Sequence, residues 1–257
     1  MIMKLAGNTV FITGGASGIG RGIAEALHRK GNKVIISGRR QELLDEVVKA
    51  NPGMDAVRLD VTSPGQIEQV AKELIAKYPD LNVVFNNAGI MPPDDVTGPL
   101  NDSQAVHLIN TNLLGPVRVS AAFVEHLKKQ PNAAIINTSS TVAFIPMVMF
   151  ALYSATKAAI HSYTLSQRFA LRDTSVHVLE LAPPWVDTDL VQKSGDPRAM
   201  QVEPFVEEAL KLLETATTEV VVEAARQFRN AVGPNEHGVV EQFNQFIIDN
   251  PLPLPTP

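Results

Sequence analysis

The chain contains no cysteine, which excludes both a disulfide framework and a thiol nucleophile. It also has no long basic run, and its formal net charge is −5, so we do not expect nucleic-acid binding. No apolar stretch approaches the roughly 18 residues of a membrane-spanning helix, so we expect no membrane partner. The opening run, residues 1–5, is too short to be a signal peptide before Gly7 and Asn8 interrupt it. These absences favour a cytoplasmic protein.

Metal-ligand spacing is also missing, because the histidines are scattered along the chain. They are His28, His107, His126, His161, His177 and His237. With no cluster of ligands at short spacing, we interpret each as a surface or hydrogen-bonded histidine and predict no metal site.

Short apolar runs alternate with longer amphipathic segments along most of the chain, which predicts strands and helices in turn. The predicted strands are 9–13, 33–37, 54–59, 82–85, 133–137 and 176–181, with a short last one at 219–222. The predicted helices are 19–30, 41–50, 63–77, 104–129, 151–172 and 203–213. Near-continuous apolar strands separated by helices predict a parallel sheet covered on both faces, an α/β doubly wound fold.

The 257 residues, 45% of them hydrophobic, suffice for one large core, so we predict a single domain over residues 1–257. Between 187 and about 203 the periodic pattern is lost, and we interpret 187–214 as a substrate lid. The proline-rich end, 249–257, is predicted to be an extended tail.

A glycine-rich turn follows the first predicted strand and opens the first helix. Gly14, Gly18 and Gly20 have the spacing G-x-x-x-G-x-G, which permits a tight turn and close approach of backbone to a pyrophosphate. Backbone amides at the helix N-terminus then face the negative charge. A lone glycine triplet can be an ordinary turn, but this one has the strand and helix that a dinucleotide site requires.

The end of the second predicted strand lacks the carboxylate that usually binds the ribose 2′-hydroxyl of NAD. Gly38, Arg39 and Arg40 stand there instead. A guanidinium suits a 2′-phosphate, so we predict NADP(H), with NAD(H) as the alternative if both arginines are simply solvated.

Tyr153 and Lys157 are four residues apart, and they therefore share one face of a predicted helix. Hydride transfer to a ketone builds negative charge on its oxygen, which a proton donor must meet. A free tyrosine has a pKa of about 10, and a nearby lysine cation lowers it. Tyr-x-x-x-Lys alone is a weak signal; Ser140, thirteen residues earlier and after the fifth strand, strengthens it.

Over about residues 5–190 the chain resembles the short-chain dehydrogenase/reductase family. The motifs that match are Thr13-Gly14, Gly18 and Gly20, Asp60-Val61, Asn86-Asn87-Ala88-Gly89, Asn112, Ser140, Tyr153 and Lys157. Within the family it resembles the branch named as oxidoreductases of the D-alanine–teichoic acid locus.

The resemblance implies a role for each matching residue. Asn112, Ser140, Tyr153 and Lys157 form the catalytic set: Ser140 orients the carbonyl, Lys157 also binds the nicotinamide ribose, and Asn112 holds a water that links Lys157 to solvent. The cofactor-binding residues it implies are Gly14, Ser17, Gly18, Ile19, Gly20, Arg39, Arg40, Asp60, Val61, Asn87, Ala88, Gly89, Tyr153, Lys157, Pro183, Val186 and Thr188.

Three departures from the family pattern bear on specificity and assembly. Pro183-Pro184 replaces the usual Pro-Gly and stiffens the loop at the nicotinamide. Ser17 stands where many NADP-preferring relatives carry a basic residue. The usual C-terminal strand ending in Asp-Gly-Gly is absent from the sequence, which favours a homodimer over a tetramer.

The wall expected beside the nicotinamide is apolar. It comprises Val142, Ala143, Phe144, Pro146, Phe150, Pro184 and Trp185, to which the lid adds Leu190, Met200 and Phe205. Such a wall fits a hydrophobic ketone or secondary alcohol as the small-molecule substrate. The alternative is that several of these residues pack the lid against the core.

The sequence thus predicts an NADPH-dependent carbonyl reductase that acts in reverse as a secondary alcohol dehydrogenase. A dinucleotide-binding regulatory protein on the same fold is the main alternative, because fold alone does not determine function. A related reaction such as imine reduction or dehydration is the third hypothesis.

Overall fold

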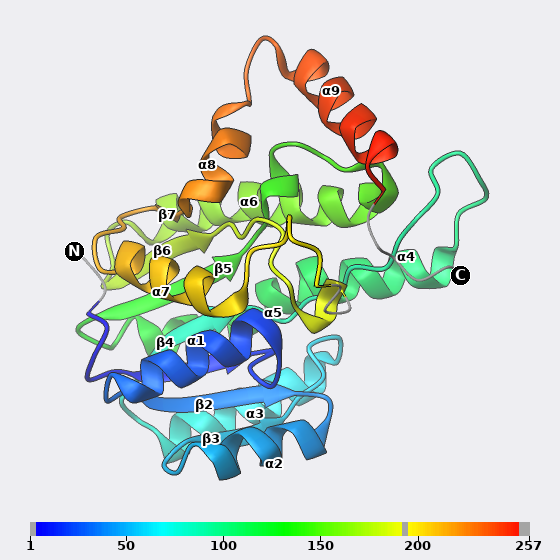
Figure 1. The fold of residues 1–257 in the computed structure, drawn as a ribbon. Helices are drawn as coiled ribbons and strands as arrows, with labels where there is room; N and C mark the ends of the chain where they lie inside the picture. The colour runs from blue at the N-terminus through cyan, green and yellow to red at the C-terminus, as the bar shows by residue number, and fades with distance from the viewer. Residues whose placement is uncertain (1–3, 192–194, 252–257) are drawn as a thin grey trace.

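In the computed structural model, which describes residues 4–191 and 195–251, seven parallel strands form one sheet in the order β3-β2-β1-β4-β5-β6-β7 (Figure 1). The strands are β1 (Thr9–Thr13), β2 (Lys33–Gly38), β3 (Asp55–Arg58), β4 (Leu81–Asn86), β5 (Ala133–Thr138), β6 (Val176–Leu181) and β7 (Glu219–Val220). The chain order reverses between β1 and β4, and doubly wound folds bind ligands at such a switch point. The predicted fold class is confirmed.

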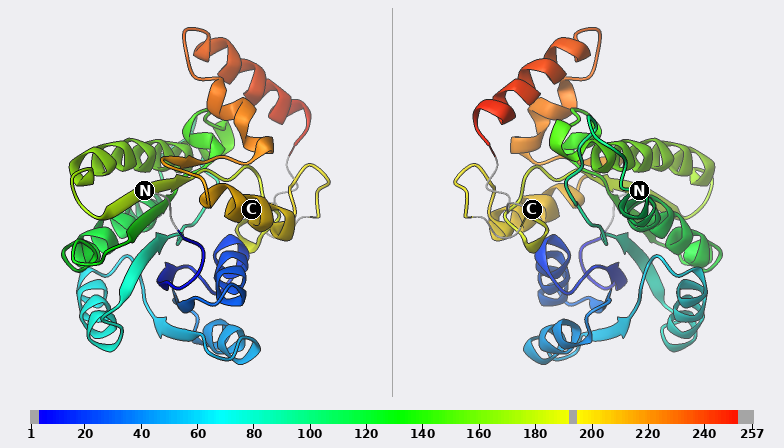
Figure 2. Two further views of the ribbon diagram at one scale, coloured as in Figure 1. Left: turned by 90° about the vertical axis from the view of Figure 1, so that its left-hand side faces the viewer. Right: turned by 90° about the vertical axis from the view of Figure 1, so that its right-hand side faces the viewer.

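Helices cover both faces of the sheet (Figure 2). One face carries α1 (Gly18–Arg29), α2 (Gln41–Ala50) and α7 (Val202–Leu213); the other carries α3 (Pro64–Lys77), α5 (Gly115–Leu127) and α6 (Ala151–Leu171), with α4 (Asp102–Ile109) beside α6. Ser63 caps α3 by accepting a hydrogen bond from the backbone amide of Gln66, as its sequence position predicts.

The core consists of two layers because successive side chains of a strand point to opposite faces. Val10 and Ile12 of β1 belong to the α1 layer, whereas Phe11 packs against Phe123 of α5 with ring centroids 5.3 Å apart. A strand buried on both faces must be apolar throughout, which explains the run Thr9–Thr13.

The helical half of the predicted lid, α7, packs into the core instead. Phe205 and Leu213 are fully buried in the α1 layer, so Phe205 is not available to a substrate. Gly22 of α1 permits this close packing, since a Cβ at Gly22 would lie 2.9 Å from the Val206 side chain. Before α7, a β-bridge between Val186 and Met200 joins the two ends of the segment 187–199. Residues 192–194 of the predicted lid lie outside the described residues.

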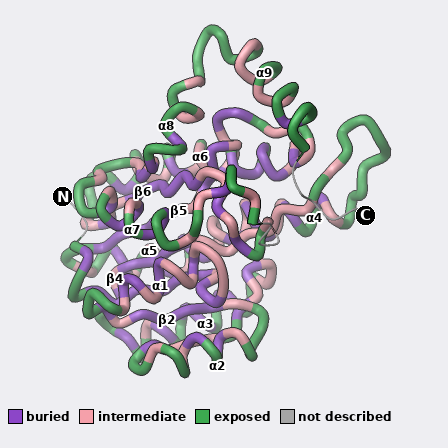
Figure 3. Tube along the Cα trace, in the orientation of Figure 1, coloured by how far each residue is buried: buried purple, intermediate pink, exposed green. Residues whose placement is uncertain are grey.

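Two C-terminal helices that we did not assign from the sequence, α8 (Glu223–Asn230) and α9 (Glu236–Asp249), project from the body of the molecule (Figure 1). They are largely half-buried or exposed (Figure 3). Phe228 and Phe243 join them edge to face, with ring centroids 5.6 Å apart. Asn244 of α9 accepts a hydrogen bond from the Val148 amide at 2.6 Å and donates one to the Pro146 carbonyl at 3.0 Å, which fixes α9 beside the loop before α6.

No helix in the described part of the chain is both long enough and apolar enough to cross a membrane. Of the predicted tail, residues 252–257 lie outside the described residues.

Candidate active site

One cavity of about 770 Å³ runs along the carboxyl ends of the strands, from the glycine turn to the helices α8 and α9, which we call the C-terminal arm. The predicted residues at its cofactor end are Gly14, Ser17, Gly18, Ile19, Arg39, Arg40, Asp60, Val61, Asn87, Ala88, Gly89, Pro183, Val186 and Thr188, and all of them line it. The structure thus brings these residues together.

The turn between β1 and α1 depends on glycine for its shape and its closeness to the next loop. Gly14 and Gly18 have positive φ angles of 68° and 52°. A Cβ at Gly14 would lie 2.8 Å from the Cα of Ala88. Ser17, at the helix N-cap, makes no side-chain capping bond, so the first amides of α1 have no side-chain acceptor at the cavity edge.

Asn87 and Thr13 lock this turn to the loop after β4. The Asn87 amide donates to the Thr13 and Gly14 carbonyls at 3.3 and 3.2 Å, and the Thr13 hydroxyl accepts from the backbone amide of Asn87 at 3.1 Å. Gly20 lies behind this contact rather than on the cavity wall. A Cβ there would lie 2.3 Å from both the Asn87 amide nitrogen and the Gly14 carbonyl oxygen, so Gly20 acts through packing.

The donor set of the cavity fits a dinucleotide. Ser37 and Thr138 line the cavity, and the buried hydroxyl of each has no hydrogen-bond partner among the described residues. Buried polar groups are normally paired, so a ligand with several oxygens suits these positions. The unpaired amides at the start of α1 add a place for phosphate.

The end of β2 presents positive charge to the same cavity. Arg39 and Arg40 are exposed, and the Arg40 guanidinium lies 3.4 Å from the Ser17 hydroxyl. Asp60, at the end of β3, uses one carboxylate oxygen to accept from the Thr62 amide and hydroxyl at 2.9 and 2.8 Å. Arg40 beside Ser17 and Arg39 at the same end of the cavity are cations that suit a phosphate.

Ser140, Tyr153 and Lys157 converge on the middle of the cavity. Tyr153 is 6% exposed and Lys157 4%. The Lys157 ammonium lies 5.5 Å from the centre of the Tyr153 ring and donates to the Thr138 carbonyl at 2.8 Å. Tyr153 and Lys157 lie on one face of α6, as their spacing of four residues predicts.

Burial shifts the titration of both side chains. It raises the pKa of Tyr153 above its ordinary value, and the hydrogen bond with Ser140 opposes this rise. Burial also lowers the pKa of Lys157 to about 8, against the charge of Glu180. Both effects arise because a charged form loses hydration inside the protein.

A π-helical turn, Asn110–Leu114, interrupts the predicted helix 104–129 and positions Asn112. Asn112 does not line the cavity directly. Its side chain is buried, accepts from the Ile90 amide at 2.9 Å and donates to the Ile90 carbonyl at 2.8 Å. Asn112 therefore fixes the backbone segment that follows Gly89, close to Lys157.

Of the predicted substrate-pocket residues, Val142, Phe150, Pro184, Trp185 and Leu190 line the cavity, as does Met200. Phe144 does not. Its ring packs edge-on against His161, with centroids 5.0 Å apart, and the Arg229 guanidinium lies 4.8 Å from the centre of the ring. The prediction for Phe144 is wrong because the chain turns into a short 3-10 helix after Ser140, which directs this ring behind the cavity wall.

Sequence reasoning missed part of the wall, which comes from the C-terminal arm. The cavity is also lined by Ala224, Gln227 and Phe228 of α8 and by Phe243, Phe246 and Ile247 of α9. Phe243, Phe246 and Ile247 have the i, i+3, i+4 spacing of one helix face, which was the available signal.

A family model described as short chain dehydrogenase matches residues 8–199. A Bacillus subtilis (strain 168) protein named "uncharacterized oxidoreductase DltE" is 40% identical over 251 residues, which cover 94% of this chain and 98% of that protein. The 3-oxoacyl-[acyl-carrier-protein] reductase FabG of Thermotoga maritima is 32% identical over 195 residues, covering 74% and 79% of the two chains.

Among solved structures, a short chain dehydrogenase from Burkholderia cenocepacia J2315 in complex with NADP superposes with a TM-score of 0.83 at 27% identity. The match covers 93% of this chain and 98% of that one. The glycine turn, the asparagine loop and the Ser140–Tyr153–Lys157 group thus lie in the part of the chain that the family model matches.

Proposed function

The chain belongs to the short-chain dehydrogenase/reductase family, and we propose that it is an NADPH-dependent carbonyl reductase that also works in reverse as a secondary alcohol dehydrogenase. That it is an oxidoreductase of this family follows from the family match and the Bacillus relative, which also confirms the branch that the sequence resembles. The observation that carries the finer proposal is the convergence of Ser140, Tyr153 and Lys157 on the cavity between the glycine turn and an apolar wall.

In the proposed reaction, the bound nicotinamide supplies the hydride, and the protein supplies the proton and the charge that stabilises its transfer. Ser140 hydrogen-bonds the substrate oxygen and holds it beside Tyr153. The Tyr153 hydroxyl then gives its proton to that oxygen as negative charge develops on it. The Lys157 cation stabilises the phenolate that remains, which makes proton release possible from a buried tyrosine.

Three observations support NADP(H) as the preferred cofactor. Arg39 and Arg40 line the cavity at the end of β2, where a carboxylate would favour NAD. Ser17 offers a hydroxyl beside Arg40. The superposed Burkholderia structure is a complex with NADP.

The substrate that we propose is an elongated apolar ketone. The wall is formed by Trp185 just before the lid, Met200 within the lid, Phe150 and Val142 beside α6, and the aromatic face of α9. A wall that continues into the C-terminal arm has room for a chain beyond the reacting carbonyl.

The same residues argue against a regulatory protein. A dinucleotide-binding regulatory protein has no need of a proton donor in a substrate cavity, yet Tyr153 and Ser140 both line this one. Imine reduction uses the same geometry with a nitrogen acceptor, so imines belong in the substrate panel.

We also propose that the protein is a cytoplasmic homodimer. Leu165 and Phe169, one turn apart on α6, are 44% and 68% exposed, and they offer an apolar face for a second copy. Within the described residues, β7 is followed by helices and by no further strand that could extend the sheet toward a tetramer.

The decisive experiment follows the oxidation of NADPH, with NADH in parallel, against a panel of apolar ketones of increasing length. Tyr153→Phe is expected to reduce turnover by about 10²- to 10⁴-fold, the usual contribution of a general acid, while NADPH still binds. Tyr163→Phe is the matched control, because Tyr163 lies on the same helix without lining the cavity. Full turnover by Tyr153→Phe would show that Tyr153 is not the proton donor. If the unmodified protein binds NADPH tightly but turns over no compound of the panel, the regulatory protein is favoured.

A further inference from the structure

A fully buried carboxylate, Glu180, lies on β6 next to the edge strand β7, and the proposed reaction assigns it no role. It occupies β6, in the run Val176–Leu181, where its neighbours along the strand are apolar. An ionised side chain is almost never buried this completely unless it is paired and hydrogen-bonded. The hydrogen-bond partners and neighbouring charges of Glu180 therefore indicate its role.

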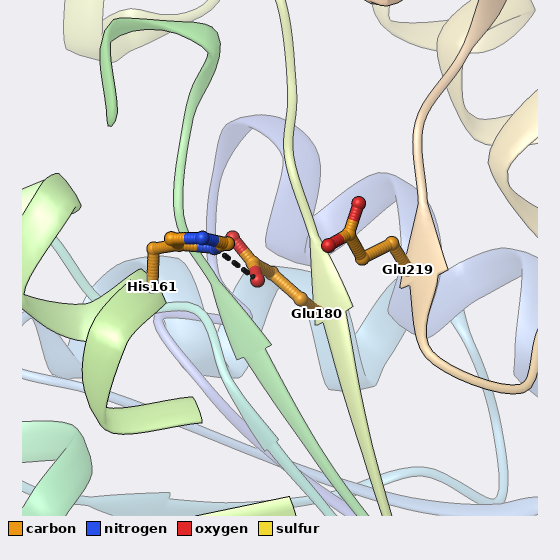
Figure 4. A group of neighbouring side chains, drawn as sticks. All are labelled: His161, Glu180 and Glu219. Carbon is orange, nitrogen blue, oxygen red and sulfur yellow. Dashed lines mark hydrogen bonds and ion pairs between the residues drawn. The ribbon is translucent and has the colours of Figure 1, made fainter. Parts of the chain in front are cut away.

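Two hydrogen bonds fix the carboxylate beside the reaction centre. The Ser139 hydroxyl, next to Ser140 in the chain, donates to one oxygen at 2.5 Å, and His161 Nδ1 lies 2.8 Å from the other (Figure 4). Because an ionised carboxylate only accepts, Nδ1 must carry the proton. His161 follows Lys157 by one helical turn, so Tyr153, Lys157 and His161 form a single stripe along α6.

Charged groups from three elements surround Glu180. Lys157 and Arg168 come from α6, Arg229 from α8 and Glu219 from β7, and the field of Glu180 acts on each of the three cations. Arg229 donates to both oxygens of Glu219 at 2.8 and 2.9 Å and holds the pKa of that carboxyl below its usual range. Glu219 is thus neutralised by its own partner, whereas the carboxylate of Glu180 is held by Ser139 and His161.

His161, Glu180 and Glu219 also lie close enough to one another to suggest a cation site, with possible ligand atoms within 4.8 Å (Figure 4). However, Arg229 already donates hydrogen bonds to both oxygens of Glu219. Ser139 and His161 hydrogen-bond the two carboxylate oxygens of Glu180. A cation there would have to displace a guanidinium, so we interpret the group as a charge cluster.

Lys157 needs a nearby anion because its surroundings disfavour its charge. It is buried, and its hydrogen bond goes to a neutral carbonyl, that of Thr138. Burial lowers its pKa to about 8, and Glu180 opposes this effect. As pH rises through that value the lysine loses its cation, and a still lower pKa would bring the loss into the neutral range.

We propose that Glu180 is a positioning residue whose buried charge keeps Lys157 in its cationic form, and that Ser139 and His161 hold the carboxylate in place for this purpose. The inference rests on the proposed role of Lys157 in the reaction. The protonation of Lys157 is nevertheless a property of the protein alone, so it can be measured whether or not a substrate is found.

The test is an NMR titration of the full-length protein labelled with ¹³C at the ε-carbon of lysine. Lys157→Arg identifies the Lys157 signal by its disappearance. Removing an opposite charge at close range typically moves a pKa by about one unit or more, so Glu180→Gln is expected to move the Lys157 midpoint down by about one pH unit. Glutamine suits the site because its oxygen accepts from His161 and its amide donates to the Ser139 hydroxyl.

Two further variants separate charge from structure. Glu219→Gln, which removes a carboxylate already neutralised by Arg229, is expected to move the midpoint less than half as far. Arg229→Gln removes a cation near Glu180, and it is expected to move the midpoint upward. Opposite signs for Glu180→Gln and Arg229→Gln are expected from an electrostatic effect and not from a general loss of packing.

An unchanged Lys157 midpoint in Glu180→Gln would overturn the proposal, as would an equal downward movement in Glu219→Gln. If Glu180→Gln fails to fold, as judged by circular dichroism, Ser139→Ala takes its place, because it removes a hydrogen bond that holds the Glu180 carboxylate. The Lys157 midpoint is then expected to move downward, and no movement or an upward movement contradicts the proposal. For any substrate found, the alkaline limit of turnover should move with the NMR midpoint. Failure to find a substrate would count against the proposed function and leave the titration result standing.

Discussion

The two halves of the cavity are built in different ways. The cofactor half consists largely of backbone and small side chains: Gly14 and Gly18 turn the chain, and Asn87 ties two loops together. The substrate half consists of bulky apolar side chains such as Trp185 and Phe246, which come from segments far apart in the sequence. The first half is therefore sensitive to the addition of a single methyl group, and the second to the loss of a large side chain.

Gly20→Ala tests most directly whether the cofactor half tolerates an added methyl group. A Cβ there meets both the Gly14 carbonyl and the Asn87 amide at 2.3 Å, so the turn must shift. We expect NADPH affinity to fall by about 100-fold, the order of effect of a 1 Å misplacement, with a stability loss of about 1–3 kcal/mol from overpacking. Binding is measured by NADPH fluorescence and stability by urea unfolding.

Gly65→Ala is the matched control, because nothing lies within 4 Å of a Cβ at Gly65 in the first turn of α3. It should leave NADPH affinity unchanged and add up to about 0.5 kcal/mol of stability. Equal behaviour of the two alanine variants would show that the cofactor half is more adaptable than its geometry indicates.

Arg39→Ala combined with Arg40→Ala tests the polar end of the cofactor half. A charge-assisted hydrogen bond contributes about 1.5–3 kcal/mol, so we expect the KM for NADPH to rise by about 10- to 100-fold. The KM for NADH should change little. Lys49→Ala, an exposed cation on α2 away from the cavity, is the control for net charge. Equal effects on both cofactors would remove the case for recognition of a 2′-phosphate.

Phe246→Ala tests the substrate half. The Phe246 ring is 52% exposed, so its truncation removes only part of the burial energy of a phenylalanine, about 0.5–1.5 kcal/mol. We expect the KM for long apolar ketones to rise by about 2- to 10-fold, an order set by that energy, and the KM for short ketones to stay constant. Ile248→Ala, on the same helix but away from the cavity, should change neither value. A similar rise for short and long ketones would show that α9 does not determine substrate length.

The smallest effect on catalysis is expected from Phe169→Glu, which lies outside both halves. A charge on this exposed face of α6 should convert the proposed homodimer into a monomer, as measured by light scattering after gel filtration. Turnover per subunit should remain, because Phe169 does not line the cavity. Ala76→Glu, on the exposed face of α3, places the same charge away from α6 and should leave the dimer intact. A dimer that survives Phe169→Glu must associate through another surface.

Elements with a strong local pattern could be predicted from the sequence. The bounds of β1, α2 and β6 agree with the prediction residue for residue, because each is a short apolar run or an amphipathic segment with clear ends. The residues of the cofactor half could be predicted too, since glycine turns and helix N-termini are local structures.

Features that depend on distant partners could not be predicted. The π-helical turn at Asn112 follows from the bonds between its side chain and Ile90, and a helical pattern cannot reveal it. Phe205 looked like a lid residue because nothing local shows that Gly22 opens a space for α7. Glu180 stood in an ordinary strand pattern, and its partners Ser139 and His161 come from other segments.

The bridge at the base of the segment 187–199 has a consequence for protein engineering. The Asp187 amide donates to the Met200 carbonyl at 2.8 Å, and the Met200 amide donates to the Trp185 carbonyl at 2.9 Å. The two ends are thus clamped independently of what lies between them, and doubling the length of such a loop costs only about 0.6 kcal/mol in closure entropy. Loops of different length and sequence can therefore be substituted in this segment. Libraries that vary the length and composition of the segment after Thr188 should alter which ketones are accepted and leave the nicotinamide site and α7 where they are.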